Sequence, residues 1–152
     1  MELRCVWTDG NNEIFRYFYQ ITEDYYSSLV GGAENRRGFI PYNLSSDIGD
    51  VLLVFCGDIP AGCAGLKRYS HDAAEIKRVW VEPDFRGNGI ATRMMQLIEA
   101  KALESGYKRT ILQTREIMRD AVGLYERLGY IRTDNYPPYD KLDGAVCFAK
   151  EL

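Results

Sequence analysis

Residues 80–91 read Trp80-Val81-Glu82-Pro83-Asp84-Phe85-Arg86-Gly87-Asn88-Gly89-Ile90-Ala91, a strand that breaks at a proline, a turn with spaced glycines, and a helix start. Glycines at 87 and 89 avoid Cβ clashes and let backbone amides approach a ligand closely. The helix opening near Ile90 adds free N–H donors and a positive dipole end. Arg86 adds a charge that suits two phosphate oxygens. The stretch predicts an anion site, although a bare Gly-x-Gly is more often only a tight turn.

Two better-known phosphate loops do not fit these residues. A Walker loop needs Gly-Lys-Ser/Thr at the helix start, and the sequence here is Gly89-Ile90-Ala91. A dinucleotide-binding loop needs three glycines in the spacing G-x-G-x-x-G, and Thr92 occupies the third position. A nucleotide-binding domain of either kind is therefore excluded.

The remaining pattern, Arg86-x-x-Gly89-x-Ala91 after Val81-Glu82-Pro83, resembles the coenzyme A pyrophosphate loop of the GNAT superfamily of N-acetyltransferases. That family loop is written Gln/Arg-x-x-Gly-x-Gly/Ala. Residues 75–81, Glu-Ile-Lys-Arg-Val-Trp-Val, look like the family's central strand. Residues 121–130 are similar to its Ala-x-x-Leu-Tyr-x-x-x-Gly-Phe segment. The resemblance is strong over residues 51–152, with one departure, because Met118 stands where the family often has an asparagine.

The periodicity of the chain predicts an α/β (α+β) fold. A strand, loop, helix and strand after Ala74 imply a parallel pair with a right-handed crossover, while hairpins around it are antiparallel. The GNAT resemblance implies one mixed, mostly antiparallel sheet, with a central splayed parallel strand pair flanked by helices. We expect a single domain over residues 1–152. Expected strands are 3–8, 51–55, 61–69, 74–81, 108–113, 131–133 and 145–150, and expected helices begin after Asn12, at Ile90 and near Ala121.

Composition limits the classes of partner. A net charge of −3 and a pI near 5.3 argue against general nucleic-acid binding. No apolar run has the length of a membrane span and the N-terminus resembles no signal peptide, so we expect a cytoplasmic protein without membrane contact. The scattered cysteines and the single histidine, His71, predict no metal site. A homodimer remains open.

The resemblance implies acetyl-CoA as co-substrate and assigns its binding residues. The phosphates would bind the loop formed by Arg86, Gly87, Asn88, Gly89, Ile90 and Ala91. The pantetheine would bind the backbone of Val79, Trp80 and Val81, where a backbone N–H also faces the thioester oxygen. Tyr125, at the family's tyrosine position, would contact the thiol and protonate the leaving thiolate. Spacing alone would make Tyr125 a core residue.

An acceptor ammonium titrates near about 10.4, so it must lose a proton before it attacks. Glu75 matches the glutamate that some family members use as the base, directly or through water. The alternative is a surface glutamate at the start of a strand. Lys77 shares the strand face of Glu75 and could pair with it or bind an acidic acceptor.

These residues together predict an acetyl-CoA-dependent N-acetyltransferase that transfers the acetyl group to a primary amine of a small molecule by direct attack on the thioester. Arg36, Arg37, Lys77 and Arg115 suit an acceptor that carries a carboxylate, such as an amino acid or a related metabolite. Singly, each is more often a solvated side chain. The alternative is a catalytically silent GNAT-fold module that binds or senses acyl-CoA.

Overall fold

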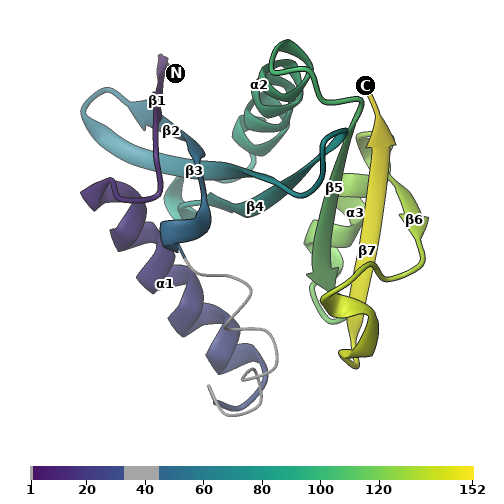
Figure 1. Ribbon diagram of the computed structural model, residues 1–152. Helices are drawn as coiled ribbons and strands as arrows, with labels where there is room; N and C mark the ends of the chain where they lie inside the picture. The colour runs from purple at the N-terminus through teal and green to yellow at the C-terminus, as the bar shows by residue number, and fades with distance from the viewer. Residues whose placement is uncertain (1, 33–44) are drawn as a thin grey trace.

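Seven strands form one sheet in the order β1-β2-β3-β4-β5-β7-β6 in the computed structural model, which describes residues 2–32 and 45–152 (Figure 1). Three helices accompany the sheet. The strands are β1 (Leu3–Thr8), β2 (Asp50–Cys56), β3 (Ile59–Arg68), β4 (Ala73–Val81), β5 (Arg109–Arg115), β6 (Ile131–Thr133) and β7 (Ala145–Glu151), and the helices are α1 (Glu13–Leu29), α2 (Ile90–Glu104) and α3 (Arg119–Arg127). Short 3-10 turns lie at Ser45–Asp47, Pro83–Phe85 and Tyr139–Lys141.

The sheet is mixed, as the sequence predicts. β4 and β5 run parallel and are joined through α2, while every other neighbouring pair is antiparallel. The parallel ladder joins residues 73–76 to residues 109–112 and ends there. β4 continues to Val81 and β5 to Arg115. The two strands therefore splay beyond Ile76, which confirms the expected splayed pair.

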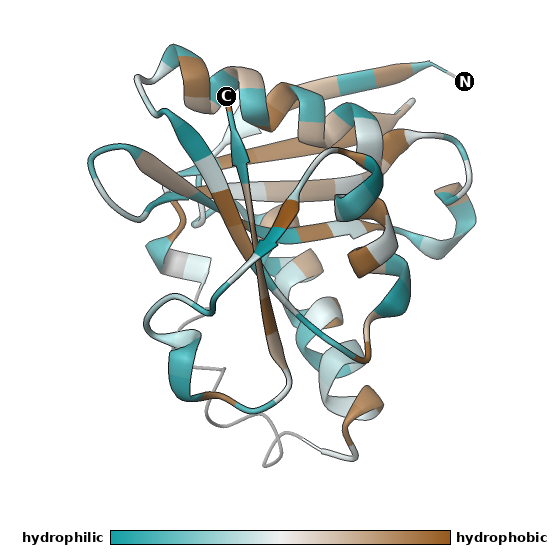
Figure 2. Cartoon of the chain, turned by 90° about the vertical axis from the view of Figure 1, so that its right-hand side faces the viewer, coloured by the Kyte–Doolittle hydropathy of each residue, from teal (hydrophilic) through white to brown (hydrophobic). Residues whose placement is uncertain are grey.

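Alternating side chains of the strands contribute to the two larger hydrophobic cores, and a smaller cluster forms around Tyr139 and Cys147. On one face, Leu52, Ile76 and Leu112 belong to the cluster that includes Met94 and Ile98 of α2. On the other face, Phe15 and Phe18 of α1 belong to a cluster with the strand residues Val51, Leu53, Cys63 and Trp80. Figure 2 shows hydrophobic residues concentrated in the central strands and hydrophilic residues in the loops around them.

Both long helices begin where the sequence predicts. The side chain of Asn12 accepts hydrogen bonds from the backbone N–H groups of Ile14 and Phe15, at 2.9 and 3.1 Å, and so caps α1. Gly89 precedes α2 with φ at +76°, in the left-handed region that favours glycine. Trp80 packs beneath α1, with its ring 5.4 Å from that of Tyr25 in an edge-on contact.

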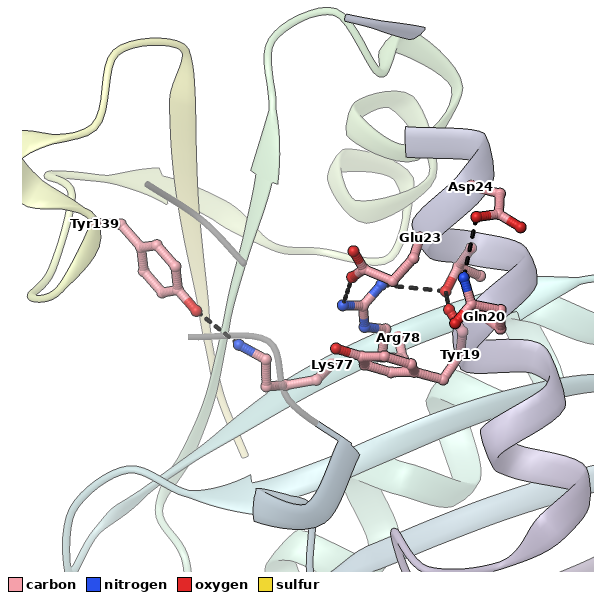
Figure 3. Close-up of polar contacts among 8 residues, drawn as sticks. Tyr19, Gln20, Glu23, Asp24, Lys77, Arg78 and Tyr139 are labelled. Atoms are coloured by element: carbon pink, nitrogen blue, oxygen red, sulfur yellow. Dashed lines mark hydrogen bonds and ion pairs between the residues drawn. The ribbon is translucent and has the colours of Figure 1, made fainter. Parts of the chain in front are cut away.

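A bulge in β4 lies next to the splay, and the sequence analysis missed it. Cys63 pairs with Trp80 and Gly65 pairs with Lys77, so β4 has one more residue than β3 across this interval. Arg78 in the bulge has φ at +57°, which a non-glycine residue rarely adopts. The neighbouring side chains of Lys77 and Arg78 point to different partners, Tyr139 and helix α1 (Figure 3).

Helix α1 holds the side chain of Arg78 in place. The guanidinium donates to Thr22 Oγ1 at 3.1 Å, forms an ion pair with Glu23, and lies 4.3 Å from the ring centre of Tyr19. All of these partners come from one face of α1 (Figure 3). The bulge and α1 are therefore fixed to each other, and α1 forms one wall of the opening between β4 and β5.

Candidate active site

A pocket of about 550 Å³ lies at the splay, bounded by β4, the loop into α2, the end of α1 and the start of α3. Its volume falls in the range of about 300–1,000 Å³ that is typical of small-molecule sites. Residues that line it include Tyr25, Tyr26, Leu29, Val79, Trp80, Val81, Arg86, Gly87, Gly89, Ile90, Ala91, Met118, Arg119, Ala121 and Tyr125. The pocket therefore contains most of the residues that the sequence analysis assigned to a cofactor.

One end of this pocket combines a tight glycine turn, the start of a helix and an arginine. Gly87 and Gly89 both have positive φ, at +80° and +76°, so the chain turns tightly into the first turn of α2. The first amides of a helix have no partners within the helix and carry its positive dipole end. Arg86 Nε donates to the carbonyl of Val81 at 2.9 Å, and its guanidinium lies 4.8 Å from the Trp80 ring centre. These contacts hold the arginine at the pocket edge.

The side chain of Asn88 bonds to the loop backbone and does not line the large pocket. Its side-chain amide donates to the backbone carbonyls of Phe85 and Arg86, at 3.0 and 3.2 Å. It is not among the residues that line the large pocket. The Asn88 side chain therefore stabilises the turn, and any contact with a ligand would come from its backbone.

A smaller pocket of about 100 Å³ opens further along the splay, toward the end of the ladder between β4 and β5. It is lined by Glu75, Ile76, Lys77, Arg78, Gln113, Thr114 and Arg115, together with residues that also line the large pocket. The shared residues are Tyr26, Val79, Met118, Ala121 and Tyr125. The two pockets are thus neighbours, and the structure brings Glu75 and Tyr125 to the same small space.

Tyr125 lies on α3 with 8% of its surface exposed. Its ring packs against Tyr130 and Phe148, with ring centres 6.0 and 6.3 Å apart. Burial raises the pKa of the Tyr125 phenol well above its usual value, with a smaller contribution from Tyr26. The phenol is therefore neutral near pH 7 and keeps a proton that it can donate.

Glu75 lies in a buried network of polar side chains and is 5% exposed. Tyr136 Oη donates to its Oε2 at 2.7 Å, and Lys77 Nζ lies 3.6 Å from its Oε1. Lys77 Nζ also donates to Tyr139 Oη at 2.6 Å (Figure 3). Glu75 is therefore not the surface glutamate that the alternative interpretation supposed.

The network changes the proton affinities of its members. Burial, opposed by the nearby Glu75 carboxylate, lowers the pKa of Lys77 from 10.5 to about 8. Burial and then Glu75 raise the pKa values of Tyr136 and Tyr139. The sequence analysis did not assign roles to these two tyrosines, which reach Glu75 and Lys77 from a loop more than 60 residues later.

Met118 lines both pockets at the point where the family often has an asparagine. Thr114 Oγ1 lies 3.5 Å from its sulfur.

Arg36 and Arg37 lie outside the described residues. In the described part of the chain, no group of three or more His, Cys, Asp or Glu side chains could hold a metal ion, and no helix is long and apolar enough to cross a membrane.

Comparison with known proteins identifies the family. The model of the acetyltransferase (GNAT) family matches residues 15–130, and the chain belongs to this family. YjgM of Escherichia coli (strain K12), an uncharacterised N-acetyltransferase, is 33% identical over 73 residues, which are 48% of this chain and 44% of YjgM. The chain spans less than half the length of the curated relatives it matches.

Solved structures show the same fold. A Klebsiella pneumoniae protein assigned as an acyl-CoA N-acyltransferase aligns with a TM-score of 0.81 and 19% identity, over 99% of this chain and 97% of that one. A GNAT family acetyltransferase from Elizabethkingia anophelis, crystallised with acetyl-CoA bound, aligns with a TM-score of 0.70 and 20% identity, over 99% and 98% of the two chains.

The loop geometry predicts that Gly89→Val weakens acetyl-CoA binding by about tenfold, which is about 1.4 kcal/mol. A β-branched residue is strained at φ +76°, so the amides at the start of α2 must move. Gly57→Val is the matched control, because Gly57 also has a positive φ and open space around it but lines neither pocket. Calorimetric titration of the variants measures the effect, and equal affinities for Gly89→Val and the parent protein would place the phosphates elsewhere.

Proposed function

We propose that this protein is an acetyl-CoA-dependent N-acetyltransferase that transfers the acetyl group to a primary amine of a small molecule by direct attack on the thioester. The observation that carries the proposal is the continuity of the two pockets. An anion site at the start of α2 leads along β4 to a small space lined by Glu75 and Tyr125. Membership of the GNAT family and the acetyl-CoA bound to the Elizabethkingia structure support the same conclusion.

The residues of the large pocket fit the parts of acetyl-CoA. Arg86 and the amides of residues 87–91 suit the two phosphates. The edge of β4 beyond Ile76 has left the ladder with β5, so the backbone of Val79, Trp80 and Val81 can bind the pantetheine amides. The same edge can donate an N–H to the thioester oxygen as negative charge develops on it. The co-substrate supplies the activated acetyl group, and the chain supplies position and proton transfer.

Glu75 and Tyr125 divide the proton transfers between them. Glu75 accepts the proton that the acceptor ammonium loses, directly or through water, and its bond from Tyr136 holds the carboxylate in position. Tyr125, neutral and buried, gives a proton to the departing thiolate. The shared small pocket keeps the base and the acid near the same reacting carbonyl.

The charges of the small pocket favour an acceptor that carries a carboxylate beside its amine. Lys77, Arg78 and Arg115 line it, with Lys77 beside Glu75 and Arg78 ion-paired with Glu23, so three cationic side chains meet two carboxylates. A polyamine would meet excess positive charge there, whereas an amino acid or a related metabolite would offer a carboxylate to an arginine.

A panel of amines tests the function and the acceptor class together. Initial rates of thiol release are compared for amino acids, polyamines, aminoglycosides and lysine-rich peptides at fixed acetyl-CoA. We expect carboxylate-bearing amines to react fastest. Polyamines or peptides that clearly react faster would overturn the acceptor class. Binding of acetyl-CoA with no thiol release from any amine would favour a silent acyl-CoA-binding module.

Substitution of Tyr125 and of Glu75 tests separately the proton given to the thiolate and the proton taken from the ammonium. We expect Tyr125→Phe to lower kcat by about 10²- to 10⁴-fold, the usual contribution of general acid catalysis, with acetyl-CoA affinity nearly unchanged. Glu75→Gln should lower turnover most on the acidic side of the pH profile, because the ammonium needs a base there and the free amine becomes abundant as pH rises toward about 10.4.

Rate profiles from pH 6 to about 10 measure both effects, and thermal unfolding of each variant checks that the fold is intact. Tyr107→Phe serves as a control, since Tyr107 lines neither pocket. Full activity of Tyr125→Phe would reduce that residue to a packing role. An unchanged profile for Glu75→Gln would assign deprotonation to water or to another group.

A further inference from the structure

Lys77 is a primary amine that belongs to the enzyme itself and lies in the reaction pocket. It is 7% exposed and follows Ile76, the last residue of β4 that pairs with β5. It lines the same small pocket as Tyr125 and Glu75. The reaction proposed above transfers an acetyl group to a primary amine and assigns no step to this one.

The size of the small pocket limits the distances within it. Its volume of about 100 Å³ is much smaller than the 550 Å³ of the large pocket. An acetyl group that enters past Val79 and Tyr125 from the large pocket therefore lies in the same narrow space as the side chain of Lys77. A lysine side chain, with its long flexible stem, needs only a rotamer change to move its Nζ atom within such a space.

The surroundings of Lys77 Nζ lower its pKa and also hold the atom in a hydrogen bond. The atom faces Tyr139 Oη at 2.6 Å and Glu75 Oε1 at 3.6 Å, and the charges of Lys67 and Arg78 also act on it. A pKa of about 8 leaves about one amine in ten unprotonated at pH 7, against about one in several thousand for an exposed lysine near 10.4. The bond to Tyr139 directs Nζ to a residue outside the small pocket.

We propose that Lys77 is a self-acetylation site, which accepts the acetyl group of acetyl-CoA when no acceptor amine is bound. This inference rests on the proposed function. Lys77 Nζ, as the free amine, attacks the thioester carbonyl carbon; the C–N bond forms and the C–S bond breaks. The nitrogen loses one proton to Glu75, and the leaving thiolate takes one from Tyr125. The products are Nε-acetyl-lysine at position 77 and coenzyme A with a free thiol.

Acetylation of Lys77 would also change the site. The amide is neutral, so the buried Glu75 carboxylate loses its ion-pair partner. The acetyl group would also take up space in a small pocket of about 100 Å³. We therefore expect the modified enzyme to lose acceptor turnover, and we expect a bound acceptor to protect Lys77 by reacting first.

Mass spectrometry of the intact protein and of its peptides tests the proposal, after incubation with acetyl-CoA and no acceptor. We expect one acetyl group on Lys77, none at that position in Lys77→Arg, and slower labelling in Tyr125→Phe. Tyr139→Phe should speed labelling by about fivefold, the factor that corresponds to one ordinary hydrogen bond. Lys150→Arg is the matched control, because Lys150 is ion-paired with Glu99 at 2.9 Å and lines neither pocket.

Addition of a substrate amine should suppress the label. The proposal is overturned if the parent protein and a folded Tyr139→Phe variant carry no acetyl group on Lys77 after incubation without an amine, while separate portions of the same samples acetylate an amine that is added to them. It is also overturned if labelling spreads over exposed lysines and does not depend on Tyr125. A labelled Lys77 without turnover of any small amine would instead overturn the proposed function and leave self-acetylation standing.

Discussion

The site depends on the contacts that helix α1 makes with the side chain of Arg78. Arg78 sits in the β4 bulge with a positive φ, a conformation that costs about 1–3 kcal/mol. Its ion pair with Glu23 is nearly buried, and removing one partner of such a pair typically costs about 3–5 kcal/mol. The contacts of Arg78 with Thr22, Glu23 and Tyr19 fix the bulge to α1 beside the opening between β4 and β5.

The opening connects an exposed loop with a buried space, and the two differ in their electrostatic environment. Residues 86–89 are exposed and lie at the positive end of α2, which suits the attraction of a charged co-substrate from water. The space around Glu75, Lys77 and Tyr125 is buried, and there burial shifts the pKa values of the lysine and the tyrosine in opposite directions. In the function proposed above, separate parts of one continuous site serve binding and proton transfer.

The parts of this site that could be predicted from the sequence are those set by local pattern. Spaced glycines after a strand predict the loop at residues 86–91, and alternation predicts that Glu75 and Lys77 share a face. The hydrogen-bond partners of Arg78 in the bulge, Thr22 and Glu23, lie 56 and 55 residues earlier in α1, and no signal around residue 78 marks the bulge. Tyr136 contacts Glu75, and Tyr139 contacts Lys77, only because the loop before β7 lies close to β4. That proximity follows from the order of the strands in the whole sheet, which local sequence does not reveal.

In the proposed function, acetyl-CoA lies in the opening between β4 and β5, with its phosphates at the start of α2. Hydrogen–deuterium exchange of the full chain, with and without acetyl-CoA, tests it most directly, because it reports each backbone amide without any substitution. The account predicts slower exchange at residues 78–82 and 87–92 on binding, and little change at the distant edge strands β1 and β6. Protection at those edges, with unchanged exchange at residues 78–92, would contradict it.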